Sequence, residues 1–293
     1  MEIETGVPLS RLTTIGTGGP AAALGRPSTL GELEEAVAWA AERGMEVVTI
    51  GLGSNVLAAD EGVEALVLRL EGELASVSID DDLLAAGGGA TNAVCLHRAR
   101  SAGLGGLEFA CAIPGTAGGG VRMNAGAYGS DWSAILNRAL VVSSAGTGWL
   151  GAAELGLSYR HSSLEPGQAV AWVEYRLTPR PPDEIKAEVA DLLARRKATQ
   201  PTNKRTFGSV FKNPPGEIGA GRMIELSGLK GHRIGGAVIS PRHANFIENA
   251  GAATSADCFL LMEEARRRVR EQFGIALEHE VVQLGSLGDR DAG

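Results

Sequence analysis

The chain has 293 residues and a mass of 30.3 kDa, a length for which two or more domains are the ordinary expectation. Hydrophobic residues make up 44% of the sequence, which is enough for a substantial core and excludes intrinsic disorder. A formal net charge of −8, without a strongly basic segment, argues against nucleic acid as a partner.

The first third of the chain predicts a helix followed by short strands. A capping box formed by Thr29 and Glu32 begins a helical apolar pattern that ends at Gly44, and the β-rich run 47–50 follows. The glycine-rich segment 51–55 then leads into a turn and a further strand. No room is left for a helix directly after this segment.

The middle of the chain predicts a second unit from residue 71 onwards. A helix is expected from Thr91 to Ala102, strands are expected through Tyr175, and the glycine-rich segment 113–120 is expected to be a loop. A proline-rich break precedes a helix over 183–199. The side chains expected to point inward from this helix are Ile185, Val189, Leu192 and Leu193.

A last domain is predicted from residue 200. Its final helix is capped by Thr254 and stopped by Gly274, and Arg266 to Arg268 are expected to form a solvated face. The acidic tail Asp289 to Asp291 is expected to be frayed. The predicted division of the chain is therefore 1–70, 71–199 and 200–293, and the last residues could return to the first part.

The two glycine-rich segments favour a phosphate-bearing ligand. Glycine turns let backbone N–H groups approach a phosphate, although either segment alone is more often a set of ordinary turns. Gly51 and Gly53 begin a G-x-G-x-x-G pattern, but Val56 occupies the position of the third glycine and no helix follows. An NAD-binding Rossmann site is therefore disfavoured, whereas two segments with hydroxyl and amide side chains between the glycines suit an extended dinucleotide.

Candidate reactive residues occur in three further motifs. Ser209, Lys212 and Asn213 lie in an alternating aromatic and polar segment that turn chemistry alone does not explain. Arg160 and Glu280 are singly unremarkable, since such charges are usually solvated. The five histidines show no H-x-x-x-H spacing and no serine lies in a G-x-S-x-G motif, so neither a metal site nor a serine hydrolase is expected.

Taken in order, these motifs resemble those of the UDP-N-acetylenolpyruvoylglucosamine reductase family, and the resemblance covers nearly the whole chain. The matching stretches are 13–20, 51–55, 113–116, 124–129, 159–162, 207–214, 220–225, 230–237, 243–247 and 277–281. The resemblance implies an α+β fold with two FAD-binding subdomains of the PCMH or vanillyl-alcohol oxidase type and a C-terminal α+β substrate-binding domain. The region after Tyr128 shows no obvious insertion, which suggests the shorter subtype of the family.

The resemblance also implies a reaction and its site. Family members are FAD-dependent oxidoreductases that use NADPH to reduce UDP-N-acetylglucosamine enolpyruvate to UDP-N-acetylmuramate for peptidoglycan and cell wall synthesis. By resemblance, Ser209 is the proton donor, Arg160 stabilises negative charge, and Glu280 is the third catalytic residue. The implied cofactor residues are Gly51, Gly53, Ser54, Asn55, Ile113, Pro114, Gly115, Thr116, Gly119, Gly120, Asn124, Gly126 and Ala127. The implied substrate residues are Tyr159, Lys212, Asn213 and Arg222.

Two rival functions remain at this point. One is a flavoprotein of the same architecture that acts on another substrate, and the other is a nucleotide-sugar-binding regulator without redox activity. The three cysteines lack a C-x-x-C pair, and the chain shows neither a signal peptide pattern nor an apolar run of about 20 residues. We therefore expect no disulfide framework and no membrane span, and a cytoplasmic protein without an obligate protein partner.

Overall fold

The computed structural model describes residues 1–288, and the predicted acidic tail Asp289 to Asp291 lies outside the described residues. The chain divides into two compact units, each built from separate segments. Unit 1 comprises Met1–Thr5, Ala23–Leu52 and Ala65–Arg196, and unit 2 comprises Gly6–Ala22, Gly53–Glu64 and Lys197–Gly293. The predicted boundaries at residues 70 and 199 remain predictions.

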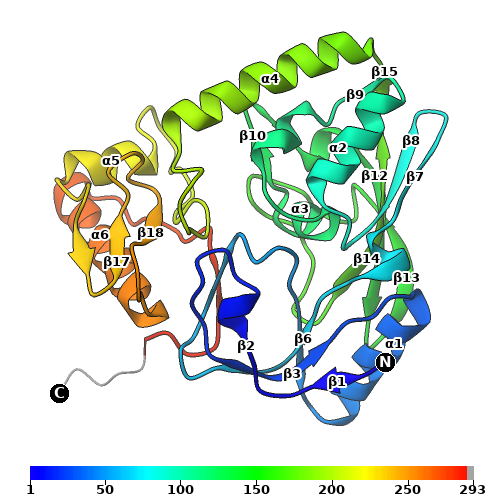
Figure 1. Cartoon of the computed structure of the whole chain (residues 1–293), viewed down its shortest axis with the longest axis horizontal. Coiled ribbons are helices and arrows are strands. Elements are labelled where there is room, and N and C mark those ends of the chain that lie inside the picture. Colours follow the sequence, from blue (N-terminus) through cyan, green and yellow to red (C-terminus); the bar gives the residue numbers. More distant parts are fainter. Residues whose placement is uncertain (289–293) are drawn as a thin grey trace. The chain divides into compact units, whose positions relative to one another are not determined.

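The chain contains both helices and strands, with several groups of consecutive strands (Figure 1). The helices are α1 (Leu30–Glu42), α2 (Asn92–Ser101), α3 (Ala117–Met123), α4 (Pro182–Thr199), α5 (Ala220–Leu226) and α6 (Ser255–Phe273). The strands up to residue 105 are β1 (Ile3–Glu4), β2 (Val7–Pro8), β3 (Pro20–Gly25), β4 (Glu46–Thr49), β5 (Val56–Ala58), β6 (Val63–Leu68), β7 (Val77–Asp80), β8 (Leu83–Gly87) and β9 (Leu104–Gly105). The later strands are β10 (Gly126–Ala127), β11 (Ser130–Asp131), β12 (Leu136–Ser143), β13 (Gly146–Gly151), β14 (Ala169–Arg176), β15 (Thr178–Pro179), β16 (Arg233–Ile234), β17 (Ala237–Ile239), β18 (Ile247–Asn249) and β19 (Val282–Leu284).

Unit 1 is centred on a five-stranded antiparallel sheet in the order β13-β12-β14-β8-β7. Its long strands are hydrophobic on both faces. Along β14, Val170 and Val173 belong to the core that includes α2 and α3, whereas Ala169 and Ala171 belong to the core that includes α1, and the register with β12 shifts near Ala171. Burial on both faces explains why β12 and β14 read as nearly continuous apolar runs.

The predicted helix starts in unit 1 are confirmed. The Thr29 hydroxyl accepts the N–H of Glu32 at the start of α1, and Thr91 caps α2 by accepting the N–H of Val94. The Glu32 carboxylate in turn accepts the N–H of Ser28 at 2.7 Å, which lowers the pKa of Glu32. These caps fix both helix starts at residues whose side chains satisfy otherwise unpaired N–H groups.

The glycine run 118–120, which the sequence predicts as a loop, begins helix α3 instead. Thr116 caps this helix, and its hydroxyl accepts the Gly119 N–H at 3.4 Å. The run is helical because two of its glycines, Gly118 and Gly120, pack closely. A Cβ at Gly118 would lie 3.0 Å from the Gly88 carbonyl oxygen, and one at Gly120 would lie 2.6 Å from the Trp132 indole. Tertiary packing therefore overrides the weak intrinsic helix propensity of glycine.

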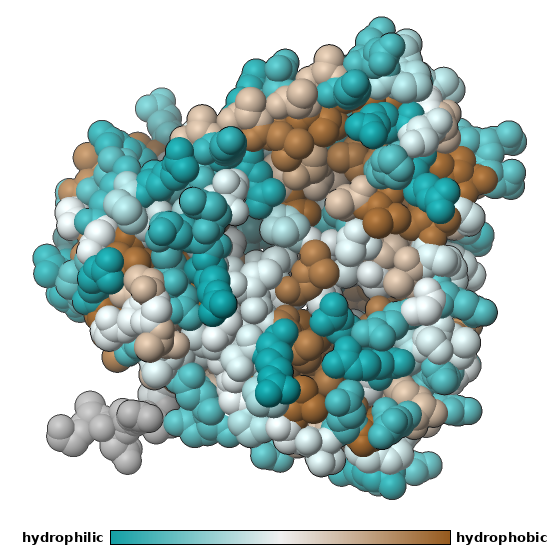
Figure 2. Space-filling view, in the orientation of Figure 1, coloured by the Kyte–Doolittle hydropathy of each residue, from teal (hydrophilic) through white to brown (hydrophobic). Residues whose placement is uncertain are grey.

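Helix α4 confirms the predicted helix but corrects the prediction that Leu193 points inward. Ile185 and Leu192 are buried, and Val189 is partly buried, whereas the Leu193 side chain is 43% exposed. The three inward residues lie at i, i+4 and i+7 on one stripe, and Leu193 follows one position later, about 100° around the helix. Figure 2 shows brown and beige side chains among the teal ones along α4.

Unit 2 combines a three-stranded antiparallel sheet, β16-β17-β18, with α5 and α6. Its core contains residues from all three of its segments, including Ile15, Leu57 and Phe207. Strand β19 pairs in parallel with β5, so the last described strand returns to the segment around residue 57. Neither unit has, within residues 1–288, a helix long and apolar enough to cross a membrane.

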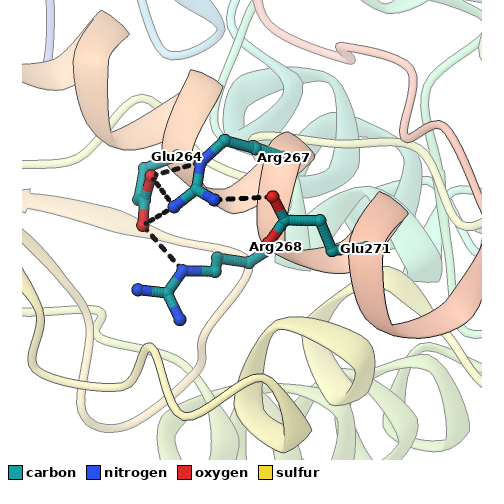
Figure 3. Close-up of polar contacts among 4 residues, drawn as sticks. All are labelled: Glu264, Arg267, Arg268 and Glu271. Carbon is teal, nitrogen blue, oxygen red and sulfur yellow. Dashed lines mark hydrogen bonds and ion pairs between the residues drawn. The ribbon is translucent and has the colours of Figure 1, made fainter.

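Helix α6 has the predicted limits and the predicted charged face. Thr254 and Asp257 form a capping box, and Gly274 ends the helix in the left-handed region at φ +70°. Two of the three consecutive arginines lie on the solvated face, where Glu264 contacts both Arg267 and Arg268 (Figure 3). The third, Arg266, contacts Glu263 and donates to the Leu277 carbonyl at 3.2 Å.

Candidate functional site

Two predicted cofactor segments contact each other inside unit 1. A Cβ at Gly51 would lie 2.6 Å from the Thr116 hydroxyl, so only glycine permits this close approach. Thr116 also pairs with Thr91 across an isolated antiparallel bridge. Gly51, which closely follows β4, therefore lies directly beside Thr116, the cap of α3.

The loop leading to Thr116 is held by a residue that the sequence analysis missed. Asn92 is 2% exposed, its side-chain amide donates to the Ile113 carbonyl at 3.1 Å, and its backbone N–H donates to the Gly115 carbonyl at 3.0 Å. Asn92 directly follows the cap of α2. The one sequence feature that could have identified Asn92 is its position next to a capping threonine, and that feature predicts a role in starting the helix rather than in holding the loop.

The two predicted cofactor glycines of α3 have different environments. Gly119 is exposed, and the nearest atom to a Cβ built there is the Thr116 hydroxyl oxygen at 3.5 Å. Gly120 is buried against Trp132. Gly119 is therefore exposed beside Thr116 without a side chain that would obstruct a phosphate-bearing cofactor, whereas the visible role of Gly120 is packing.

Asn124 lies at the end of α3 in the left-handed region, with φ +36°, and is 1% exposed. Its side-chain amide donates to the Ser158 carbonyl at 2.8 Å, and its side-chain oxygen accepts the Ser133 N–H at 3.0 Å. Gly126 and Ala127, also predicted to bind the cofactor, form β10 and pair with β11. A Cβ at Gly126 would lie 2.5 Å from the Ser130 carbonyl oxygen, so this hairpin requires glycine.

Arg160 lies at the tip of a tight turn in unit 1. Ser158 and His161 exchange backbone hydrogen bonds of 3.0 and 3.1 Å, which leaves Tyr159 and Arg160 as the two central residues. Arg160 has φ +53°, a conformation that favours glycine, and its guanidinium donates to the Gly126 carbonyl at 2.6 Å. The guanidinium also lies over the Tyr159 ring, 4.9 Å from its centroid, while the Tyr159 side chain is 50% exposed.

Unit 2 brings Ser209 and Glu280 onto neighbouring segments. The Val210 carbonyl accepts the Glu280 N–H at 2.9 Å, and the Lys212 N–H donates to the Glu278 carbonyl at 2.9 Å. Between them, Phe211 bridges His279 and their rings stack at 5.3 Å. Ser209 therefore directly precedes the residue that holds the backbone of Glu280.

The predicted cofactor residues Ser54 and Asn55 belong to the same cluster. The Asn55 side-chain amide donates to the Glu280 carbonyl at 3.0 Å, and the Asn55 carbonyl accepts the Val282 N–H at 3.0 Å. A Cβ at Gly208 would lie 3.2 Å from the Ser54 carbonyl oxygen, and Gly208 has φ +80°. Three segments far apart in the sequence thus meet around Ser209 and Glu280.

A second residue missed by the sequence analysis supports Ser209 from the opposite edge. Asn245 is 4% exposed, and its side chain binds both backbone groups of Phe211: it accepts the N–H at 3.0 Å and donates to the carbonyl at 2.8 Å. Its own carbonyl accepts the Val210 N–H at 2.9 Å. Asn245 therefore makes the hydrogen bonds that a neighbouring strand would otherwise make. Without it, the buried backbone groups of Val210 and Phe211 on this side would lack partners.

The predicted substrate residues of unit 2 lie in and before α5. The Asn213 side-chain oxygen accepts the N–H of Ala220 at 3.0 Å, at the first residue of α5, and the Lys212 ammonium lies 3.6 Å from Glu278. Arg222 forms an ion pair with Glu225 at 3.1 Å. Hydrogen bonds from Lys230 and Arg222 lower the pKa of the Glu225 carboxyl. These cations suit an anionic ligand.

The candidate catalytic residues are thus divided between the units. Unit 2 contains Ser209 and Glu280, and unit 1 contains Arg160 in its own hydrogen-bonded turn. Unit 2 can supply a hydroxyl and a carboxylate, and unit 1 can supply a permanently charged guanidinium. Among the described residues, no group of three or more His, Cys, Asp or Glu side chains could hold a metal ion.

Comparison with known proteins gives two family matches. Residues 200–284 match the C-terminal domain of UDP-N-acetylenolpyruvoylglucosamine reductase, and residues 21–149 match an FAD-binding domain. The UDP-N-acetylenolpyruvoylglucosamine reductase of Anaeromyxobacter dehalogenans (strain 2CP-C) is 45% identical over 280 residues, which are 96% of this chain and 85% of that protein. The one from Rubrobacter xylanophilus is 44% identical over 280 residues, 95% of this chain and 94% of that protein.

A solved structure is also similar over nearly the full length. The crystal structure of UDP-N-acetylenolpyruvylglucosamine reductase from Thermus caldophilus aligns with a TM-score of 0.85 at 38% identity, covering 97% of this chain and 100% of that one. Together with the two domain matches, this similarity confirms the predicted α+β fold with an FAD-binding part and a C-terminal reductase part.

Proposed function

Because the chain belongs to the UDP-N-acetylenolpyruvoylglucosamine reductase family, we propose that it reduces UDP-N-acetylglucosamine enolpyruvate to UDP-N-acetylmuramate with NADPH as the hydride source. The chain is accordingly an FAD-dependent oxidoreductase of peptidoglycan precursor synthesis. The observation that carries the proposal is that the segments containing Ser54, Ser209 and Glu280 contact one another in unit 2. The similarity to the solved reductase structure covers 97% of the chain and so includes both the FAD-binding and the C-terminal part.

The cofactor is held, in this proposal, by the open backbone of unit 1. Gly51 and Gly119 both lie against Thr116, and the exposed Gly119 carries no side chain that would obstruct a ligand, which fits the diphosphate of FAD. When bound, FAD supplies the hydride transfer that no side chain can perform. The chain's own residues then have to bind the substrate, stabilise charge and deliver a proton.

Ser209 is the proposed proton donor. Addition of hydride to the enolpyruvyl double bond leaves a carbon that must gain a proton, and a serine hydroxyl is a weak acid without help. Glu280 follows in the paired segment and is proposed to resupply the proton or to polarise the substrate carboxyl. Pairing of the Val210 carbonyl with the Glu280 N–H fixes the spacing of the two backbones.

Arg160 is proposed to stabilise the negative charge that builds towards the substrate carboxylate. A guanidinium stays charged at any working pH and can bind a carboxylate with two parallel hydrogen bonds. Such stabilisation is largest where water is excluded. Tyr159, Lys212, Asn213 and Arg222 are the proposed substrate-binding residues, since Lys212 and Arg222 suit a diphosphate and Asn213 and Tyr159 offer hydrogen-bonding groups.

We place this reaction in the cytoplasm. Cys95, Cys111 and Cys258 are all free thiols, as expected for a protein of a reducing compartment.

Anaerobic stopped-flow kinetics of the two half-reactions test the proposal. Ser209→Ala should leave flavin reduction by NADPH intact and slow reoxidation by the enolpyruvyl nucleotide by about 10² or more, the usual loss when a general acid is removed. The matched control is Ser227→Ala, because the Ser227 hydroxyl donates to the Met223 carbonyl at 3.0 Å near the end of α5. Wild-type protein that binds flavin but is not reoxidised by this nucleotide would refute the proposed function in favour of another substrate.

A further inference from the structure

We propose that Asn124 is a positioning residue for Arg160, which it holds through the turn from Ser158 to His161. The kinetic part of this inference rests on the proposed function, whereas its structural part does not. The sequence alone places Asn124 among cofactor residues, and the geometry points to a different role.

Both polar atoms of the Asn124 side chain are hydrogen-bonded to the backbone of the protein. Its amide nitrogen donates to the Ser158 carbonyl at 2.8 Å, and its oxygen accepts the Ser133 N–H at 3.0 Å. Only 1% of the residue is exposed. A buried asparagine with both ends bonded to backbone has no accessible amide surface with which to recognise a cofactor, and losing either bond would leave a buried polar group unpaired.

The segment 124–126 fixes the Arg160 turn at two points. Asn124 binds the carbonyl of the first turn residue, Ser158, and the Gly126 carbonyl accepts the Arg160 guanidinium at 2.6 Å. Arg160 itself has φ +53°, a backbone conformation that is unfavourable for a residue other than glycine. A strained turn of this kind persists only when its surroundings hold it, and Asn124 supplies the buried contact.

A substitution at position 124 can remove the hydrogen bond to Ser158 and keep the one to Ser133. Because Asn124 has φ +36°, its replacement must tolerate the left-handed region, as aspartate does. Asn124→Asp keeps an oxygen for the Ser133 N–H but, when ionised, presents a second acceptor to the Ser158 carbonyl. Only the bond to the Arg160 turn is then lost. A protonated aspartate can donate a hydrogen bond, so lowering the pH should restore that bond.

The test is a double-mutant cycle on the flavin-loaded protein. Asn124→Asp should slow reoxidation by the enolpyruvyl nucleotide at least about tenfold at pH 8, with flavin content and reduction by NADPH unchanged, and the loss should shrink as the pH falls. In an Arg160→Ala background the same change should have little further effect, since residues that act through one group are not additive. Equal effects in both backgrounds would mean that Asn124 does not act through Arg160. Loss of flavin from Asn124→Asp would mean that Asn124 binds the cofactor instead.

A second measurement is independent of catalysis. Peptide-resolved hydrogen exchange should show faster exchange of the 158–161 turn in Asn124→Asp than in the wild type. The control is Asn137→Asp, which makes the same change in unit 1 where the side chain donates to Glu174 at 3.1 Å. Unchanged protection of the turn in Asn124→Asp would overturn the inference, whether or not the wild type reduces the enolpyruvyl nucleotide. A wild type that does not reduce this nucleotide would by itself contradict only the proposed function.

Discussion

Two adjacent glycines of α3 should respond in opposite ways to the same methyl group. In Gly120→Ala the new Cβ would lie 2.6 Å from the Trp132 ring. That ring has little freedom to move, because it is fully buried, packs edge-on against Phe109 and donates to the Tyr175 hydroxyl at 2.6 Å. In Gly119→Ala the nearest atom is the Thr116 hydroxyl oxygen at 3.5 Å, an ordinary contact.

The expected magnitudes follow from these contacts. Overpacking costs typically 1–3 kcal/mol, and we take about 3 kcal/mol for Gly120→Ala because the ring is fixed. Alanine regains at most about 1 kcal/mol of helix propensity over glycine. Gly120→Ala should therefore destabilise unit 1 by about 2 kcal/mol, whereas Gly119→Ala should stabilise it by a few tenths to about 1 kcal/mol.

Urea unfolding of the flavin-free protein, followed by tryptophan fluorescence, measures this difference directly. The four tryptophans, Trp39, Trp132, Trp149 and Trp172, all belong to unit 1. Flavin affinity provides the second readout: if the open backbone at Gly119 faces the cofactor, Gly119→Ala should lose flavin despite its higher stability. A Gly120→Ala protein as stable as Gly119→Ala would refute the packing argument.

Three further outcomes are expected. Burial, and to a lesser extent Lys230, lowers the pKa of His243 from 6.5, so the folded state binds fewer protons than the unfolded state. The free energy of unfolding should therefore decrease as the pH drops below about 6.5. Urea titrations of His243→Gln should show a smaller decrease. Burial raises the pKa of Cys95 and Cys258 to about 12, so mass spectrometry should find both unalkylated by iodoacetamide in native protein at pH 8 and modified after denaturation. Thr254→Ala should cost about 1 kcal/mol by removing the cap at the start of α6, seen as faster hydrogen exchange of that helix, and unchanged exchange would contradict this assignment.

Local signals in the sequence predict the elements whose determinants are local. The caps at Thr29, Thr91 and Thr254 and the stop at Gly274 all depend on residues within one turn of the helix end, and each lies where it was expected. The helical state of the glycine run 118–120 is not predictable from local signals, because it depends on Trp132 and Gly88, whose approach no local pattern reveals.

The candidate site was predictable as a set of residues but not as a set of contacts. Family resemblance supplies Ser209, Arg160 and Glu280, whereas the asparagines that hold their segments act across long separations. Asn55 and Glu280 are 225 positions apart, and Asn124 and Ser158 are 34 apart. An asparagine that binds a distant backbone looks, in sequence, like one that binds a ligand, since either use places a polar residue in a glycine-rich stretch.

The discontinuous make-up of unit 2 has a consequence for synthesis on the ribosome. Ile15 and Leu57 emerge early, yet their core partners, such as Phe211 and Met262, and the strand partner of β5, Val282–Leu284, are translated much later. At roughly 5–20 residues per second, these early segments wait on the order of ten seconds or more with apolar side chains uncovered. Unit 2 can therefore close only after residue 284 has emerged, and until then its two early segments, 6–22 and 53–64, would need shielding, as a chaperone could provide.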